Sequence, residues 1–300
     1  MELEAGQVAV VTGASGGIGL ALAERFARSG LHVVLADVDE AGLTAAAERI
    51  RGLGVDTLIV PTDVSDETAV EALAVASFER FGAAHVICNN AGVTTRADPW
   101  FGPLAAWQWV LGVNLWGVIH GVRAFLPRLI EQGEGYIVNT ASMAGLIPGL
   151  SPAYDASKHA VVALTEDVYS MLQVLGLPIG ASVLCPGWVR TQIFEAERNW
   201  PEALGDAPPP GLASAVVEPH LRRAVAEGMT PMAVADLVAD AVTEARFWVF
   251  PHPEFVELAA QRWDTIAEGR NPEGAGDTPG MPPAEQLAAE VTALLAPPPT

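Results

Sequence analysis

The sequence predicts a single α/β domain in which helices cover both faces of a doubly wound, parallel β-sheet. Short runs rich in Val, Ile and Leu alternate along the chain with amphipathic stretches of helical period. The first apolar run ends in a glycine-rich turn that opens a helix. Half of the 300 residues are apolar, which is enough for one large core. Right-handed crossovers between parallel strands then wind the sheet in both directions.

Each element follows from its pattern. Apolar runs at residues 8–11, 32–36, 57–61, 85–88, 136–139, 181–185 and 246–250 predict strands buried on both faces. Apolar side chains recur at helical spacing over residues 17–29, 41–53, 66–81, 104–131 and 154–175. Residues 195–230, with three consecutive prolines, predict an insertion between a strand and a helix. We expect one domain over residues 1–270 and a Pro- and Gly-rich tail over 271–300, with a short helix at 285–295.

The composition excludes several classes of protein. A net charge of -20 argues against nucleic acid or an anionic membrane as partner. No uninterrupted apolar run approaches the roughly 18 residues that span a bilayer. The start of the chain is acidic, which is not typical of a signal peptide, and Cys88 and Cys185 predict buried free thiols. From the lack of a membrane-spanning run and of a signal peptide, we expect a cytoplasmic protein. The histidines and cysteines lack the spacing of a metal site, so we also expect no bound metal.

Lys158 is the only lysine among 16 basic residues, and it follows Tyr154 by four positions. Positions i and i+4 share one face of a helix, so the phenol and the ammonium can point into one cleft. A neighbouring positive charge favours phenolate and lowers the pKa of a tyrosine, which suits a general acid/base. The alternative is that this lysine survives by chance.

The glycine-rich turn at residues 12–19 stands between a strand and a helix, where bare backbone and the helix N-terminus can receive a pyrophosphate. Asp37 closes the second strand, 18 residues after Gly19. A carboxylate at this place can bind the hydroxyls of an adenosine ribose and repel a 2'-phosphate, which favours NAD over NADP. The alternative is that Asp37 only caps the next helix.

A set of motifs follows in order: the turn at 12–19, Asn89-Asn90-Ala91-Gly92, Asn114, Ser142, Tyr154 with Lys158, and Pro186-Gly187. Together they resemble the short-chain dehydrogenase/reductase family over about residues 6–250. The resemblance implies a single Rossmann-type domain, a nicotinamide cofactor and a catalytic tetrad.

By this resemblance, Tyr154 exchanges a proton with the substrate oxygen and Ser142 holds that oxygen by a hydrogen bond. Lys158 lowers the tyrosine pKa and binds the nicotinamide ribose, while Asn114 holds a water that links the lysine to solvent. Ser142 and Tyr154 are 12 positions apart, one fewer than is usual in the family, and the shorter loop at 146–153 is expected to reshape the pocket wall.

The same resemblance implies the cofactor contacts. Asp63 matches an adenine contact, and Val189 and Thr191 match positions that bind the nicotinamide carboxamide. The complete expected set is Gly13, Ser15, Gly17, Ile18, Gly19, Asp37, Asp63, Val64, Asn90, Gly92, Tyr154, Lys158, Pro186, Gly187, Val189 and Thr191. For Asn89 and Ala91 a purely structural role in the turn is favoured.

The loops after the fourth, fifth and sixth strands are expected to bind the substrate. Their apolar residues include Trp100, Phe101, Met143, Trp188, Phe194 and Trp200, which favours a hydrophobic small molecule. Arg96, Arg190 and Arg198 leave open the binding of a carboxylate.

The resulting hypothesis is an NAD-dependent oxidoreductase that interconverts a secondary alcohol and a ketone. The alternatives are an NADP-dependent carbonyl or imine reductase of the same fold and a catalytically silent, cofactor-sensing protein. Family resemblance also implies a homodimer or homotetramer that pairs the helices at 104–131 and 154–175.

Overall fold

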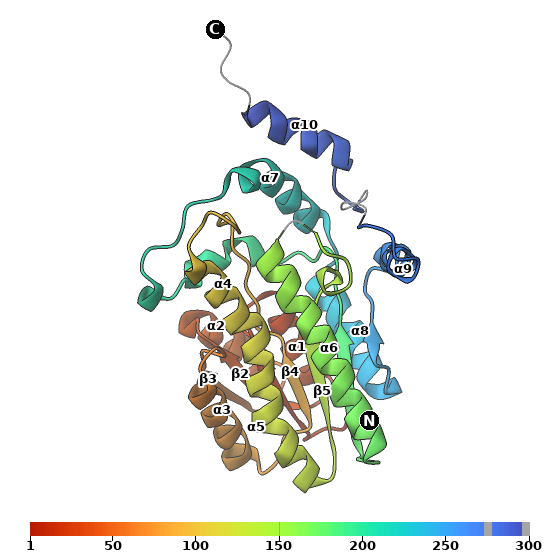
Figure 1. Cartoon of the computed structure of the whole chain (residues 1–300). Helices are drawn as coiled ribbons and strands as arrows, with labels where there is room; N and C mark the ends of the chain where they lie inside the picture. Colours follow the sequence, from red (N-terminus) through yellow and green to blue (C-terminus); the bar gives the residue numbers. More distant parts are fainter. Residues whose placement is uncertain (150, 273–277, 296–300) are drawn as a thin grey trace.

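The computed structural model describes residues 1–149, 151–272 and 278–295 (Figure 1). Its centre is a seven-stranded, entirely parallel sheet in the order β3-β2-β1-β4-β5-β6-β7. The strands are β1 Val8–Thr12, β2 His32–Asp37, β3 Thr57–Pro61, β4 Val86–Asn89, β5 Gly135–Thr140, β6 Ile179–Leu184 and β7 Trp248–Val249. The predicted fold class is confirmed.

Helices cover both faces of the sheet, because both faces of nearly every strand are apolar. On one face lie α3 (Glu67–Phe81), α5 (Gly117–Gln132) and α6 (Pro152–Val174), whose core residues include Phe125 and Leu172. On the other lie α1 (Gly17–Arg28), α2 (Glu40–Arg51) and α8 (Pro231–Glu244), with Phe26 and Val238 in the core.

Three elements differ from the sequence prediction. The helix expected at 104–131 consists of α4 (Leu104–Leu111), a π-helical turn (Gly112–Trp116) and α5. The insertion expected at 195–230 contains a regular helix, α7 (Leu212–Glu227), after two 3-10 turns at Ile193–Asn199 and Glu202–Leu204. A further helix, α9 (Glu254–Ala267), follows β7 and was not predicted. The run of prolines before α7 and Pro219 inside it conceal the helical period, since proline normally marks a helix boundary.

The short helix expected near the C-terminus is α10 (Ala284–Leu295), which lies beside α7 at the top of Figure 1. Within the described residues, Leu104–Gln132 is long and apolar enough to cross a membrane. Its most apolar window is 61% buried inside the protein, as expected of a core helix.

Candidate active site

The carboxyl ends of the parallel strands meet at one edge of the sheet and border a cleft of about 990 Å³. Most of the predicted site residues line this cleft: Gly13, Ser15, Gly17, Ile18, Asp37, Asp63, Val64, Asn90, Gly92, Ser142, Tyr154, Lys158, Pro186, Gly187, Val189 and Thr191. Gly19 and Asn114 are buried and do not line it. The strand ends therefore gather residues that are up to 178 positions apart, from Gly13 to Thr191.

The turn after β1 requires glycine for close packing. Gly13 has a φ of +68°, and a Cβ on Gly19 would lie 2.0 Å from the carbonyl oxygen of Gly13. Gly19 therefore brings α1 against the turn, whereas Gly16 and Gly17 line the cleft at the N-terminus of α1. Exposed backbone at a helix N-terminus fits the phosphates of a dinucleotide. Gly19 thus has a packing role, and its predicted contact with the cofactor stays a prediction.

Thr12 joins the ends of β1 and β4, a role that the sequence motifs did not predict. Its hydroxyl accepts hydrogen bonds from the backbone of Asn90 (2.9 Å) and Ala91 (3.1 Å). The Asn90 amide donates to the Thr12 carbonyl at 3.0 Å and accepts from the Thr140 hydroxyl at 3.2 Å. The Asn-Asn-Ala-Gly turn is thus fastened to both neighbouring strands. The sequence feature that could have predicted this role is a threonine directly before the first glycine of the turn.

Asp37 turns its carboxylate toward the glycine-rich turn. It accepts from the backbone of Ser15 at 3.0 Å and of Asp39 at 3.1 Å. The N-cap of α2 is Asp39, which accepts from the backbone of Gly42 at 2.9 Å. The reading of Asp37 as a helix cap is therefore wrong, and its carboxylate borders the cleft.

Tyr154 and Lys158 lie one turn apart on α6, with the lysine Nζ 5.6 Å from the centroid of the phenol ring. Lys158 is buried, and its ammonium donates to the carbonyl of Thr140 at 2.8 Å. Burial lowers the pKa of Lys158 to about 8. Burial also raises the pKa of Tyr154 to about 12, while a hydrogen bond with Ser142 acts in the opposite direction. The lowered tyrosine pKa expected from the sequence is not found, because desolvation of the phenol dominates.

Ser142 begins the 3-10 turn Met143–Gly145 at the end of β5. Its hydroxyl donates to the carbonyl of Pro186 at 3.3 Å and accepts from the backbone of Ala144 at 3.1 Å. The shorter spacing to Tyr154 leaves the two side chains in contact. Asp155 holds the short loop by accepting from the backbone of Gly149 at 2.8 Å, and burial raises its pKa.

Asn114 sits in the π-helical turn, a local distortion often found at functional sites. Its side chain accepts from the backbone of Val93 (2.8 Å) and donates to the Val93 carbonyl (3.0 Å) and the Ser157 hydroxyl (3.1 Å). These bonds use the buried amide to join the loop after β4 to α6. A Cβ on Gly92 would lie 3.6 Å from both Asn114 Oδ1 and Lys158 Nζ, so Asn114 stands next to the lysine without reaching the cleft.

The Pro186-Gly187 turn after β6 is held by a residue that the sequence did not suggest. The backbone of Gly187 donates to Nδ1 of the buried His252 at 3.0 Å. A Cβ on Gly187 would lie 2.9 Å from the ring of Phe255, so glycine is required for the close approach of α9. His252 thus positions the turn that precedes Val189 and Thr191.

The substrate side of the cleft is apolar, although its aromatic residues are only partly those predicted. Met143, Trp188 and Phe194 line it. Trp100 and Phe101 do not, since 71% and 93% of their surfaces are exposed. Trp200 packs edge-on against the buried Trp109, with the ring centroids 5.1 Å apart. Trp100, Phe101 and Trp200 were wrong as pocket residues.

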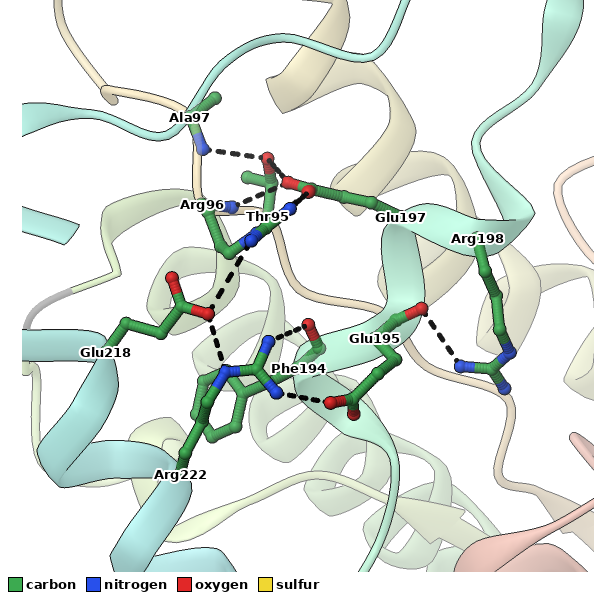
Figure 2. A network of polar contacts seen from close by, with 9 residues as sticks. All are labelled: Thr95, Arg96, Ala97, Phe194, Glu195, Glu197, Arg198, Glu218 and Arg222. Carbon is green, nitrogen blue, oxygen red and sulfur yellow. Dashed lines mark hydrogen bonds and ion pairs between the residues drawn. The ribbon is translucent and has the colours of Figure 1, made fainter. Parts of the chain in front are cut away.

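A polar network connects the three segments that surround the substrate side (Figure 2). Oε2 of Glu197 accepts from both Nε (2.9 Å) and Nη2 (2.5 Å) of Arg96, and Oε1 accepts from the Arg96 backbone N–H at 2.9 Å. Glu218 on α7 bridges Arg96 (3.6 Å) and Arg222 (2.6 Å), and Arg222 also pairs with Glu195. The guanidinium of Arg96 is therefore neutralised from two sides. Of the other arginines proposed to bind a carboxylate, Arg190 is exposed outside the cleft, whereas Arg198 lines the cleft and donates to the backbone carbonyl of Glu195.

Among the described residues, no group of three or more His, Cys, Asp or Glu side chains is placed to hold a metal ion. Cys88 and Cys185 are buried free thiols.

Residues 7–202 match the short chain dehydrogenase family. A solved short-chain dehydrogenase/reductase from Burkholderia phymatum, in complex with NAD, is 43% identical with a TM-score of 0.89, covering 93% of this chain and 100% of its own. A 1-deoxy-11-beta-hydroxypentalenate dehydrogenase from Streptomyces avermitilis is 43% identical over 61% of this chain and 68% of its own. A CLA biosynthesis dehydrogenase/reductase from Lactiplantibacillus plantarum is 31% identical over 89% of this chain and 95% of its own.

The chain therefore belongs to the short-chain dehydrogenase/reductase family. It is an oxidoreductase that acts on hydroxyl or keto groups.

Proposed function

We propose that this enzyme uses NAD to interconvert a hydrophobic secondary alcohol and its ketone, with Tyr154 as the general acid/base. The observation that carries the proposal is the convergence of Ser142, Tyr154 and Lys158 on one end of the cleft that Asp37 borders at the other. The glycine turn at the N-terminus of α1 fits the phosphates of a dinucleotide between these ends.

The chemistry that a bound nicotinamide would supply is a hydride, given to the carbonyl carbon in reduction or taken from the carbinol carbon in oxidation. Ser142 holds the substrate oxygen, and Tyr154 gives a proton to it during reduction or takes one from it during oxidation. The raised pKa keeps Tyr154 protonated at neutral pH, which suits proton donation to a ketone. Lys158 supplies the positive charge that favours phenolate when the proton leaves.

Asp37 supports NAD over NADP. Its carboxylate is fixed by two backbone N–H groups beside the glycine turn, where the adenosine ribose of a dinucleotide lies in this fold. A 2'-phosphate there would meet a fixed negative charge. The neighbour from Burkholderia phymatum, described in complex with NAD, is consistent with this preference.

Two measurements on the purified protein test the proposal. Calorimetric titration with NADH and NADPH is expected to give tighter binding of NADH. Turnover of paired apolar alcohols and ketones is then followed by the absorbance of the reduced cofactor. Tighter binding of NADPH would favour the alternative of an NADP-dependent carbonyl or imine reductase, and binding without any turnover would favour a cofactor-sensing protein.

We further propose a homo-oligomer in which the helices α5 and α6 pair with copies in another subunit. Trp116 before α5 and Met171 on α6 are exposed apolar side chains on these elements. Light scattering of the purified chain is expected to give the mass of a dimer or tetramer, and a monomer would contradict the proposal.

A further inference from the structure

The cleft extends beyond the catalytic residues into a space between α7 and the C-terminal segment. Apolar side chains of two helices form its outer walls: Val217, Leu221 and Val225 on α7, and Leu287, Ala288 and Val291 on α10. Met281, in the connection before α10, also lines it. Figure 1 shows the two helices side by side above the sheet. This outer chamber lies on the same cleft as Tyr154 and Ser142, so one molecule can occupy both.

Two hydrogen bonds place the C-terminal segment on this chamber. His220 Nε2 on α7 and Glu290 Oε2 on α10 lie 3.0 Å apart, and hydrogen bonds with Gln286 and then with His220 lower the pKa of the Glu290 carboxyl. Trp188, which directly follows the Pro186-Gly187 turn, donates its indole N–H to the carbonyl of Pro279 at 2.6 Å. The segment is therefore fastened both to α7 and to the loop that borders the reacting centre.

The opposite wall is fastened by the network of Figure 2. Glu218 and Arg222 tie α7 to the loop after β4 and to the 3-10 turn after β6. Because Arg96 and Arg222 each pair with two carboxylates, the network orders α7 without presenting these two guanidinium charges to a substrate. Arg198 also lines the cleft, where it donates to the backbone carbonyls of Gln192 and Glu195. The apolar walls of the chamber and the paired charge of Arg96 together disfavour an anionic ligand beside α7.

We propose that α10 is a specificity element for an uncharged substrate with an extended apolar body. This inference rests on the proposed function, which places the hydroxyl or keto group at Tyr154. The apolar body then runs outward between α7 and α10, and Leu287 and Val291 contact its distal end. Each methylene that enters the chamber leaves water, so α10 makes the enzyme respond to the apolar length of its substrate.

The test uses 2-alkanols from 2-butanol to 2-decanol with the full-length enzyme and its preferred cofactor. In the wild type, kcat/KM is expected to rise about fourfold for each methylene that is buried. Leu287→Asp places a carboxylate on the chamber wall, and it is expected to lower kcat/KM for 2-decanol about tenfold, mainly through KM. The rate with 2-butanol, which is too short to reach α10, is expected to stay unchanged.

Leu294→Asp is the matched control, because it makes the same change on the same helix at a side chain that is 51% exposed and lies outside the cleft lining. It is expected to behave as the wild type toward every alcohol. Leu287→Ala, a milder change that keeps a good helix former, is expected to give a smaller effect in the same direction. Equal melting temperatures of the three variants would show that the fold is intact.

Calorimetric binding of 2-decanone separates this inference from the proposed function. Equal length dependence in the wild type and in Leu287→Asp would overturn the role of α10 while leaving the dehydrogenase intact. Binding of 2-decanone that Leu287→Asp weakens, without any turnover, would support the chamber and overturn the proposed reaction. Neither binding nor turnover would overturn both.

Discussion

The ammonium of Lys158 donates a hydrogen bond to the backbone carbonyl of Thr140, the last residue of β5, at 2.8 Å. This bond links α6, which carries Tyr154, to the end of a central strand and holds the lysine Nζ over the phenol ring of Tyr154. It also explains why lysine is retained here in a chain whose 15 other basic residues are arginine. A buried, compact ammonium fits between a single carbonyl and the face of a phenol ring, whereas the planar fork of arginine does not.

Tyr154→Phe tests the proton transfer. The substitution removes only the hydroxyl, so we expect kcat to fall by about 10³-fold, within the range usual for a general acid/base. Cofactor affinity, measured by calorimetry, is expected to change by less than about threefold, because transition-state contacts do not contribute to ground-state binding. Tyr169→Phe is the control, since this tyrosine packs against Phe247 and lies outside the cleft lining. Wild-type turnover by Tyr154→Phe would contradict the assignment.

The buried ammonium of Lys158 predicts a pH dependence of stability. Its pKa is lowered from 10.5 to about 8 in the fold, so between these values the unfolded chain binds more protons at this site than the folded chain. The free energy of unfolding therefore rises with pH across this window. The raised pKa of Tyr154 has the opposite effect above pH 10, where the unfolded phenol ionises first.

Urea unfolding of the wild type and of Lys158→Met at pH 8, 9 and 10 measures this effect. The difference, wild type minus variant, is expected to increase by on the order of 2 kcal/mol from pH 8 to pH 10. Subtraction removes the contributions of groups that both proteins share. A difference that stays constant with pH would show that the lysine is charged as readily in the fold as in the unfolded chain.

Asp37→Ser tests the cofactor preference. Loss of the carboxylate removes the acceptor proposed for the ribose and the charge that would repel a 2'-phosphate, so we expect NADH to bind about tenfold more weakly and NADPH more tightly. Asp39→Ser is the matched control, because serine is also a good N-cap and keeps α2 intact. Calorimetric titration of both variants with NADH and NADPH measures the preference. An unchanged ratio of the two dissociation constants in Asp37→Ser would exclude this residue as the one that discriminates between the cofactors.

Gly19→Ala tests the packing of α1 against the glycine turn. The new Cβ would lie 2.0 Å from the Gly13 carbonyl oxygen, so the turn and the helix must separate. We expect a fall of at least about 3 kcal/mol in the free energy of unfolding, or failure to fold, as for overpacking in a rigid site. Gly16→Ala is the control, since nothing lies within 4 Å of its Cβ position. Equal melting temperatures of the two variants would contradict the assignment.

The sequence was sufficient to predict the parallel sheet and most of the cleft, because both depend on local signals. Apolar strands of Val and Ile mark the sheet, and the glycine turn and the Tyr154–Lys158 pair carry their spacing in the chain. Parallel strands have their carboxyl ends at one edge of the sheet, so motifs that follow different strands are predicted to meet there even though they are far apart in sequence.

What could not be predicted depends on long-range partners. Thr12 and His252 act through backbone groups that are 78 and 65 positions away. The helix α7 pairs with Arg96 and with α10, neither of which is adjacent in sequence. The pKa of Tyr154 was predicted in the wrong direction, because spacing reveals the neighbouring charge but not the extent of burial.

Glu197→Gln tests whether the carboxylates around Arg96 decide the charge of the substrate. Glu197 is only 11% exposed, with Oε2 accepting both side-chain bonds from Arg96 and Oε1 accepting its backbone N–H, so the amide removes the negative charge and one of the two acceptor atoms. We expect the free energy of unfolding to fall by about 1–2 kcal/mol, a value kept modest by the partial exposure of Arg96. The Arg96 guanidinium, left with Glu218 as its only paired carboxylate, is then expected to favour substrates that carry a carboxylate. The measurement is kcat/KM for a neutral 2-alkanol and for a hydroxy acid of equal chain length.

The ratio of the two values is expected to shift toward the acid by about tenfold in Glu197→Gln. Glu227→Gln is the matched control, because Glu227 pairs with Arg223 at 3.0 Å on the exposed side of α7. This pair is expected to contribute little to stability, and its loss to leave the ratio unchanged. If the ratio were equal in both variants, Arg96 would not face the substrate, and the apolar walls of the chamber alone would account for the exclusion of charge.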